Sequence, residues 1–224
     1  MYDWNKDMNF DWYVKHSGLN AVELNASFYR FPYPNQVRAW ARKGAKLRWA
    51  IKVHRSITHY SKLRGKALEV WLKFKRLFNP MEHLIDFYLF QLPPSYTKTE
   101  NNIDSLERFL AEINIGIKAA IEFRHTSWFN KDTIDLLNKY DATIVSIDAP
   151  IGTWITVSRN NIVYLRMHGR TYWYAHNYSV EELAEVAMKV KQLNPRRVYV
   201  FFNNNHWMLE NARTMLSLLT NILK

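Results

Sequence analysis

Seven short apolar segments recur along this chain, and each ends in polar or ionisable residues and is followed by a helical pattern. The segments are residues 21–25, 50–54, 89–91, 121–124, 146–148, 165–168 and 201–204. Side chains of a strand alternate between its two faces, so residues two apart share one face. The pairs that share a face are Glu23 with Asn25, Lys52 with His54, Glu122 with Arg124, and Arg166 with His168. Strands that alternate with helices predict a parallel α/β sheet with right-handed crossovers.

Two parallel architectures compete for this pattern. A doubly wound open sheet buries both faces of its central strands and makes them almost continuously apolar. The segments here carry polar side chains on one face, which favours a TIM-like (β/α) barrel whose interior opens at the carboxyl ends of its strands. A complete barrel needs eight strands, and the only strand candidate before the first helix candidate at 11–16 is the short stretch of residues 1–4. We therefore expect seven visible strands and a first strand that is missing or vestigial.

The composition indicates one globular domain over residues 1–224. No apolar run approaches the ~20 residues that span a bilayer, and the N-terminus lacks a basic-then-apolar signal pattern. We therefore expect a cytoplasmic protein without a membrane partner. The absence of cysteine excludes disulfides, thiolate catalysis and cysteine-ligated metal sites. Only six glycines are present and they form no glycine-rich phosphate loop, which disfavours a Rossmann nucleotide site.

Local signals place several helix ends. Asn35 is expected to cap a helix that ends at Gly44, and an amphipathic helix around Trp71 is expected to stop before Pro80. Ser179, followed three residues later by a glutamate, has the spacing of a capping box at the start of another helix. These helices occupy connections between the predicted strands.

The net charge of +11 is concentrated in one part of the sequence. Residues 38–76 contain thirteen Lys and Arg residues and a single acid, Glu69. A basic block is often only a solvated helix face. This block also runs through the loop after the second visible strand, which favours an anionic partner, including DNA or RNA.

The motifs at and after the polar strand ends resemble those of the YecE-like family, number 72 among the domains of unknown function. The matching stretches include Val22-Glu23-Leu24-Asn25, Lys52-Val53-His54-Arg55, Gln91-Leu92-Pro93-Pro94-Ser95, Glu122-Phe123-Arg124-His125, Asp148-Ala149-Pro150, Leu165-Arg166-Met167-His168-Gly169 and Phe202-Asn203-Asn204. They occur in the family's order over nearly the whole chain. The resemblance implies a TIM-barrel-like fold and no particular activity. Family members open with a strand that ends in Gly-Trp, of which only Tyr2-Asp3-Trp4 remains here.

The polar strand ends and the loops that follow them define the predicted site at the carboxyl-terminal face of the barrel, because side chains from different strands meet there. The candidates for acid–base catalysis are Glu23, His54, Glu122, Asp148 and His168. The candidates for substrate binding are Asn25, Lys52, Arg55, His59, Gln91, Arg124, Trp128, Arg166, Tyr172, Asn203 and Asn204.

Four interpretations of these residues remain open. They could form a satisfied ion-pair network that fills the barrel. They could bind a divalent metal through His54, His168 and the acids, although three neighbouring cations disfavour this, and no metal residue is assigned. Lys52, Arg124 and Arg166 could clamp a phosphate or carboxylate. Aromatic residues in the following loops could stack on bases or sugars.

Charge and residue types together favour an enzyme that acts on a phosphate-bearing substrate, a nucleic acid or nucleotide, by acid–base chemistry. One alternative is an isomerase or hydrolase of a small sugar phosphate or carboxylate. Another is a non-enzymatic nucleic-acid-binding protein. The residues define neither a cofactor nor an oligomeric state.

Overall fold

The computed structural model describes residues 4–5 and 9–223. The chain forms two compact units: unit 1 consists of residues 1–20, 145–157 and 161–224, and unit 2 consists of residues 21–144 and 158–160. Strand β5 (Thr143–Ala149) contributes its first two residues to unit 2 and the rest to unit 1. The expectation of a single domain over the whole chain stays a prediction.

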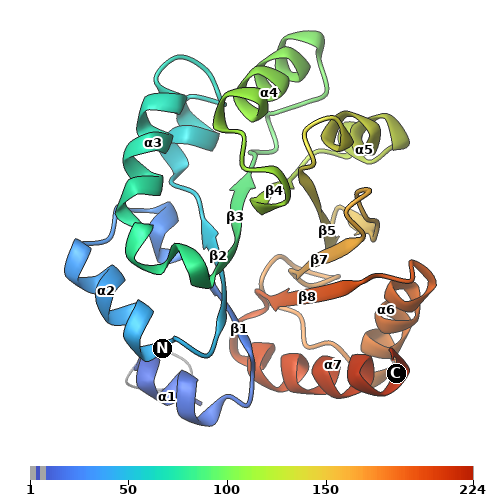
Figure 1. Ribbon diagram of the computed structural model, residues 1–224. Coiled ribbons are helices and arrows are strands. Elements are labelled where there is room, and N and C mark those ends of the chain that lie inside the picture. Colours follow the sequence, from blue (N-terminus) through green and yellow to red (C-terminus); the bar gives the residue numbers. More distant parts are fainter. Residues whose placement is uncertain (1–3, 6–8, 224) are drawn as a thin grey trace. The chain divides into compact units, whose positions relative to one another are not determined.

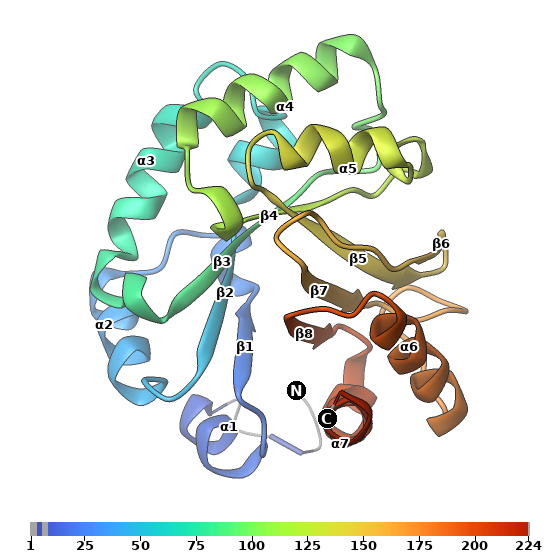
Figure 2. The same cartoon turned by 45° about the vertical axis from the view of Figure 1, so that its right-hand side comes forward.

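Unit 2 contains four further parallel strands and the helices between them. The strands are β1 (Ala21–Leu24), β2 (Arg48–Lys52), β3 (Ile85–Gln91) and β4 (Ala119–Glu122). The helices are α2 (Pro34–Lys43), α3 (Ala67–Leu77), α4 (Glu100–Ile113) and α5 (Lys131–Asn138), with short turns η1 (Ala26–Phe28), η2 (Ser56–Tyr60), η3 (Asn79–Leu84), η4 (Gly116–Lys118) and η5 (Thr126–Trp128). Figures 1 and 2 show β1, β2 and β3 side by side, with α2 and α3 along one face of them.

The helix-covered face of unit 2 is built from large apolar rings. Trp71 of α3 packs against Tyr88 and Phe90 of β3, with ring centroids 5.0 and 5.1 Å apart. Alternation along the strand then turns Leu89 and Gln91 toward the opposite face. The face of β3 that carries Gln91 is therefore the face turned away from α3.

Unit 1 contains α1 (Phe10–His16), the remainder of β5, β6 (Gly152–Trp154), β7 (Ile162–Met167), α6 (Val180–Gln192), β8 (Arg197–Phe202), the turn η6 (Asn205–Trp207) and α7 (Met208–Ile222). One buried cluster joins β7 to the two long helices: it includes Leu165 and Met167 of β7, Leu183 of α6 and Met215 of α7. Arg166, between the two β7 residues in sequence, therefore belongs to the other face of the strand.

The strand order confirms the predicted fold class. Neighbouring strands follow the order β1-β2-β3-β4-β5-β7-β8, and every pair along this path is parallel. Sequential parallel strands joined by helices are the arrangement of a TIM-like (β/α) protein. The predicted vestigial first strand falls partly on residues 1–3, which lie outside the described residues. Between residues 4 and 20, the described part of the chain forms no strand, and its only sheet-type pairing is an isolated bridge at Asn5.

Two local expectations were wrong. The connection from β5 to β7 has no helix: β6 pairs antiparallel with β5 instead, as a short hairpin around Pro150 and Gly152. Tyr33, not Asn35, is the N-cap of α2, because Pro34 occupies the first helical position, where its missing N–H costs nothing. The capping box at Ser179 is confirmed, since Glu182 N donates to Ser179 Oγ and Ser179 N donates to the Glu182 carboxylate.

None of the described helices is sufficiently long and apolar to cross a membrane.

Candidate functional site

The register of β1 to β4 brings four predicted polar residues onto one face. Glu23 pairs with Ala50, two residues before Lys52; Lys52 pairs with Leu89, two residues before Gln91; and Gln91 pairs with Glu122. Directly paired residues of neighbouring strands point the same way. Glu23, Lys52, Gln91 and Glu122 therefore lie on the face turned away from α3, at or next to the carboxyl ends of four adjacent strands.

At two of these strand ends, side-chain contacts confirm that the residues two apart share one face. Asn25 Nδ2 donates to Glu23 Oε1 at 3.0 Å. The Arg124 guanidinium and the Glu122 carboxylate form an ion pair, and both side chains are almost fully buried. A buried pair of this kind fixes a charged group in place at a large desolvation cost. This strand end therefore holds Arg124 in a defined position.

Lys52 and His59 contact the same aromatic ring. The ammonium of Lys52 lies 4.2 Å from the centroid of Phe28, and the His59 ring meets Phe28 edge-on at 4.9 Å. Burial and then the positive charges of Lys52 and Arg124 lower the pKa of His59 to about 4, against the opposing effect of a nearby carboxylate. Because this pKa lies well below neutrality, His59 is uncharged at pH 7 and sits in a cationic environment.

His54 and Arg55 follow β2 and make different contacts. His54 Nδ1 lies 2.7 Å from Ser56 Oγ, and its ring meets Phe31 at 4.9 Å. The pKa of His54 is lowered from its ordinary value, mainly by burial. A backbone hydrogen bond opposes this shift, and the charge of Arg55 adds to it. The Arg55 guanidinium lies over the ring of Tyr60. The contacts of His54 are with Ser56 and Phe31, and its shared face with Lys52 stays a prediction.

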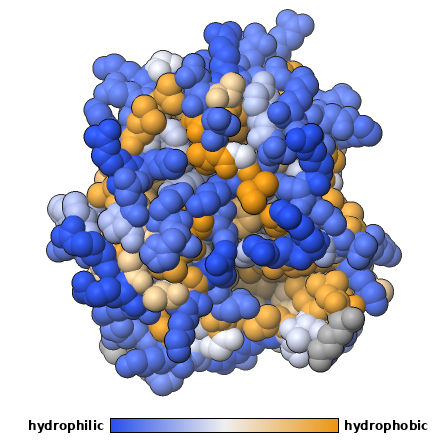
Figure 3. Space-filling model, viewed as in Figure 1, coloured by the Kyte–Doolittle hydropathy of each residue, from blue (hydrophilic) through white to orange (hydrophobic). Residues whose placement is uncertain are grey.

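The basic segment divides between two ends of the strands. Arg48 is the first residue of β2 and pairs with Asp86, so it lies at the amino end, far along the strand from Lys52. Arg42 in the last turn of α2 precedes it, whereas Arg55 follows the carboxyl end. Figure 3 shows hydrophilic residues over much of the edge where α2 and α3 lie in Figure 1. Only part of the basic segment of residues 38–76 therefore borders the polar strand ends.

Two other predicted residues of unit 2 are buried. Trp128 is fully buried, stacks on Phe123 at 4.3 Å and donates its indole N–H to the Tyr96 carbonyl at 2.7 Å, so it is part of the core. Gln91 is 8% exposed, and its Oε1 has no hydrogen-bond partner among the described residues.

In unit 1, three predicted residues meet on the face of β7 and β8 turned away from α6 and α7. Arg166 Nη1 lies 3.5 Å from His168 Nε2, which agrees with the prediction that these two side chains share one face. Arg166 Nη2 lies 3.4 Å from Asn203 Oδ1. Arg166 and His168 are almost completely buried.

Asp148 lies on the opposite face, because it pairs with Met167, which packs in the cluster with α6 and α7, while Ile147 pairs with Arg166. Asn204 is on the same side, since its side chain contacts Asn211 of α7. Asp148 is fully buried and accepts hydrogen bonds from Tyr178 Oη at 2.9 Å, Thr153 Oγ1 at 2.9 Å and Arg170 Nε at 3.2 Å.

Asn204 likewise forms hydrogen bonds to the loop after β7 and to α7. Its Nδ2 donates to the His176 carbonyl at 2.8 Å and to Asn211 Oδ1 of α7 at 2.6 Å. Asp148 and Asn204 thus tie the loop that follows β7 and the start of α7 to their strands.

The loop of residues 169–178 folds back beside β7. Gly169 has φ +102, and its N–H donates to Tyr178 Oη at 2.8 Å. Tyr172 is 69% exposed, and Trp173 lies 5.5 Å from the His168 ring. The sequence indicates an aromatic loop here, but it does not predict the hydrogen bond from Tyr178 to Asp148. It does not predict the contact between Arg55 and Tyr60 either, although Tyr60 directly follows His59.

No group of three or more His, Asp or Glu side chains among residues 4–5 and 9–223 is arranged to hold a metal ion.

Fold and strand-end chemistry together define the class: a TIM-like α/β protein with ionisable side chains at the carboxyl ends of its strands. The chain belongs to the family described as protein of unknown function DUF72, whose model matches residues 4–223. The resemblance to the YecE-like family is thereby confirmed.

Solved structures of two DUF72 family proteins have a similar fold. One, from Enterococcus faecalis V583, is 23% identical with a TM-score of 0.80, and the match covers 96% of this chain and 94% of that one. The other, from Thermotoga maritima MSB8, is 26% identical with a TM-score of 0.77, covering 95% of this chain and 88% of that one. No curated protein matches the chain.

Proposed function

We propose that this protein is an enzyme that binds a phosphate-bearing substrate at the carboxyl ends of β1 to β4 and acts on it by acid–base chemistry. The observation that carries this proposal is the environment of His59. Three cations, Lys52, Arg124 and Arg55, act on its ring, against the single carboxylate of Glu122, which already pairs with Arg124. An excess of positive charge around a neutral imidazole suits an anionic ligand.

The imidazole is suited to accept a proton beside that anion. His59 Nδ1 lies 2.9 Å from Thr58 Oγ1. If Nδ1–H donates to this hydroxyl, Nε2 carries the lone pair, and no described residue forms a hydrogen bond with Nε2. A proton would move from a water or substrate hydroxyl to Nε2, and the negative charge of the bound phosphate would stabilise the resulting imidazolium.

The basic surroundings support a nucleic acid or nucleotide over a small sugar phosphate or carboxylate. Between Glu23 and Glu69 the sequence contains no acidic residue, so the loops that follow β1 and β2 carry cations without carboxylates of their own. An extended polyanion gains from several such contacts, whereas a small anion uses only those at the strand ends.

Binding assays with matched variants test the proposal. We expect DNA or RNA oligonucleotides to bind at ~50 mM salt with salt-sensitive affinity. Lys52→Met replaces the ammonium that lies over Phe28 by an uncharged, unbranched side chain and should weaken binding by about tenfold, the effect of losing one charge-assisted contact. The control is Lys73→Met on α3, an exposed lysine that pairs with Glu69, which should bind like the parent protein.

Other outcomes separate the alternatives. If no phosphate-bearing ligand binds or raises the melting temperature, the proposal is rejected. If inorganic phosphate and small sugar phosphates stabilise the protein while oligonucleotides do not, the substrate is a small phosphorylated or carboxylated sugar. If Lys52→Met has no effect while substitution of Lys62 and Lys66 weakens oligonucleotide binding, the protein is a non-enzymatic nucleic-acid binder.

A further inference from the structure

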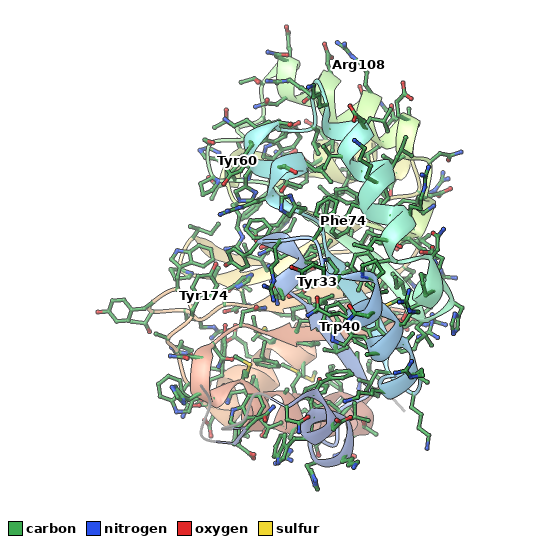
Figure 4. All side chains as sticks on the ribbon, turned by 90° about the vertical axis from the view of Figure 1, so that its left-hand side faces the viewer. Tyr33, Trp40, Tyr60, Phe74, Arg108 and Tyr174 are labelled. Atoms are coloured by element: carbon green, nitrogen blue, oxygen red, sulfur yellow. The ribbon has the colours of Figure 1, made fainter. Side chains whose placement is uncertain are left out.

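Two exposed tyrosines flank one arginine in the loops after β1 and β2. Tyr29 is 62% exposed and Tyr60 is 69% exposed. The Arg55 guanidinium carbon lies 6.0 Å from the Tyr29 ring centroid and 5.5 Å from the Tyr60 ring centroid. Figure 4 labels Tyr60 on the part of unit 2 above Tyr33. Large aromatic side chains exposed in one place around a cation are unusual on a surface that binds nothing.

This aromatic group adjoins the polar strand ends through one ring. Phe28 contacts Tyr29 edge-on at 5.1 Å and His59 at 4.9 Å. The same Phe28 ring carries the ammonium of Lys52. Two successive ring contacts therefore lead from the exposed Tyr29 to the proposed acid–base residue.

The charge around these rings selects the kind of partner. Residues 24–68 contain no Asp or Glu, so a cationic peptide or a metal ion finds no carboxylate in these loops. Planar, hydroxyl-bearing rings held against a guanidinium offer flat faces for stacking, and each base of an unpaired strand presents such a face. In a duplex these base faces are covered by neighbouring base pairs.

We propose that Tyr29, Arg55 and Tyr60 bind an unpaired base of a single-stranded nucleic acid whose adjacent phosphate lies toward Lys52. This inference rests on the proposed function, because it specifies the substrate class of the same site. Stacking on the tyrosines supplies the affinity for the base, and Arg55 adds a cation–π contact.

The test compares two strands with the same phosphates. Fluorescence anisotropy would measure binding of a 12-nucleotide single-stranded DNA and of an abasic strand of equal length. The parent protein should bind the intact strand about tenfold more tightly or better, the effect expected from one or two stacked bases. The double variant Tyr29→Ala/Tyr60→Ala should lose that preference and bind both strands like the abasic one.

Two controls separate this inference from the proposed function. Tyr140→Ala changes a tyrosine that follows α5 and precedes β5, at the amino ends of the strands, and should keep the preference for the intact strand. Lys52→Met should weaken binding of both strands equally. Equal binding of the two strands by the parent protein would overturn the base site and leave phosphate binding intact. If neither strand binds, the base site is rejected, and the proposed function then fails as well unless inorganic phosphate or a sugar phosphate raises the melting temperature. If phosphatidylserine vesicles bind through the two tyrosines while the strands do not, the base site is rejected in favour of a membrane contact.

Discussion

His59 shows how a single residue at the strand ends couples charge to pH. Its pKa in the folded protein, about 4, is below the ordinary value of 6.5, because burial and then Lys52 and Arg124 disfavour the imidazolium. Between these two values the unfolded chain binds a proton that the folded protein does not. The free energy of unfolding therefore falls as the pH decreases from 6.5 toward 4, and is unaffected by this group above 6.5.

His59→Gln should remove that part of the acid sensitivity. Urea unfolding at pH 8 measures the structural cost of the substitution, since His59 is neutral there in both states. From pH 7 to pH 5 the variant should then lose less unfolding free energy than the parent protein. Parallel losses in the two proteins would show that His59 is not held neutral by its neighbours.

Glu122 and Arg124 form the other residue-scale test. Glu122→Gln leaves the buried Arg124 without its carboxylate, and we expect the free energy of unfolding to fall by roughly 3–5 kcal/mol. Glu107→Gln breaks an exposed pair with Lys139 and should cost about 0–1 kcal/mol. Urea titrations of both variants check the difference. A Glu122→Leu/Arg124→Leu double variant should recover much of the loss, and similar losses for the two single variants would contradict the argument.

At the scale of elements, the loop after β7 depends on one backbone conformation. A Cβ at Gly169 would lie 2.6 Å from the Tyr172 carbonyl oxygen and 2.8 Å from His176 Cβ, at a φ of +102. Gly152 in the β5–β6 hairpin also has a positive φ, +125, but a Cβ there meets nothing within 4 Å. We expect Gly152→Ala to cost about 1 kcal/mol and Gly169→Ala roughly 2 kcal/mol more, measured by urea unfolding. Equal costs would show that the loop shifts freely.

The same elements show how far the sequence predicts the site. Alternation correctly placed the side chains that end β1, β4 and β7, because in each case two polar residues at i and i+2 mark one face. β5 is buried along its whole length, so its pattern distinguishes no face, and the side of Asp148 follows only from its pairing with Met167. The burial of Trp128 could not be predicted from the sequence, because a tryptophan in a loop after a strand can either bind a ligand or pack in the core.

At the scale of the whole molecule, the net charge of +11 overstates the charge that a ligand meets. The basic residues in the last turn of α2, Arg42 and Lys43, and Lys46 in the turn before β2 lie toward the amino end of β2, away from Lys52 and Arg55. In the sequence, these residues and those near Lys52 form one basic segment, residues 38–76. The parallel strand order separates them by the length of β2, because a residue before a strand and a residue after it lie at opposite ends.

This separation predicts the salt dependence of oligonucleotide binding. A single strand held by about three cations at the carboxyl ends should give a log–log slope of roughly −2, far shallower than a twelve-charge surface would give. Arg42→Gln/Lys46→Gln removes two exposed charges at the amino ends and should leave that slope unchanged. Arg55→Gln removes one charge beside the strand ends and should make the slope shallower by about 0.7. If the first variant changes the slope and the second does not, the ligand binds the α2 surface, and the strand-end site is not where phosphate is recognised.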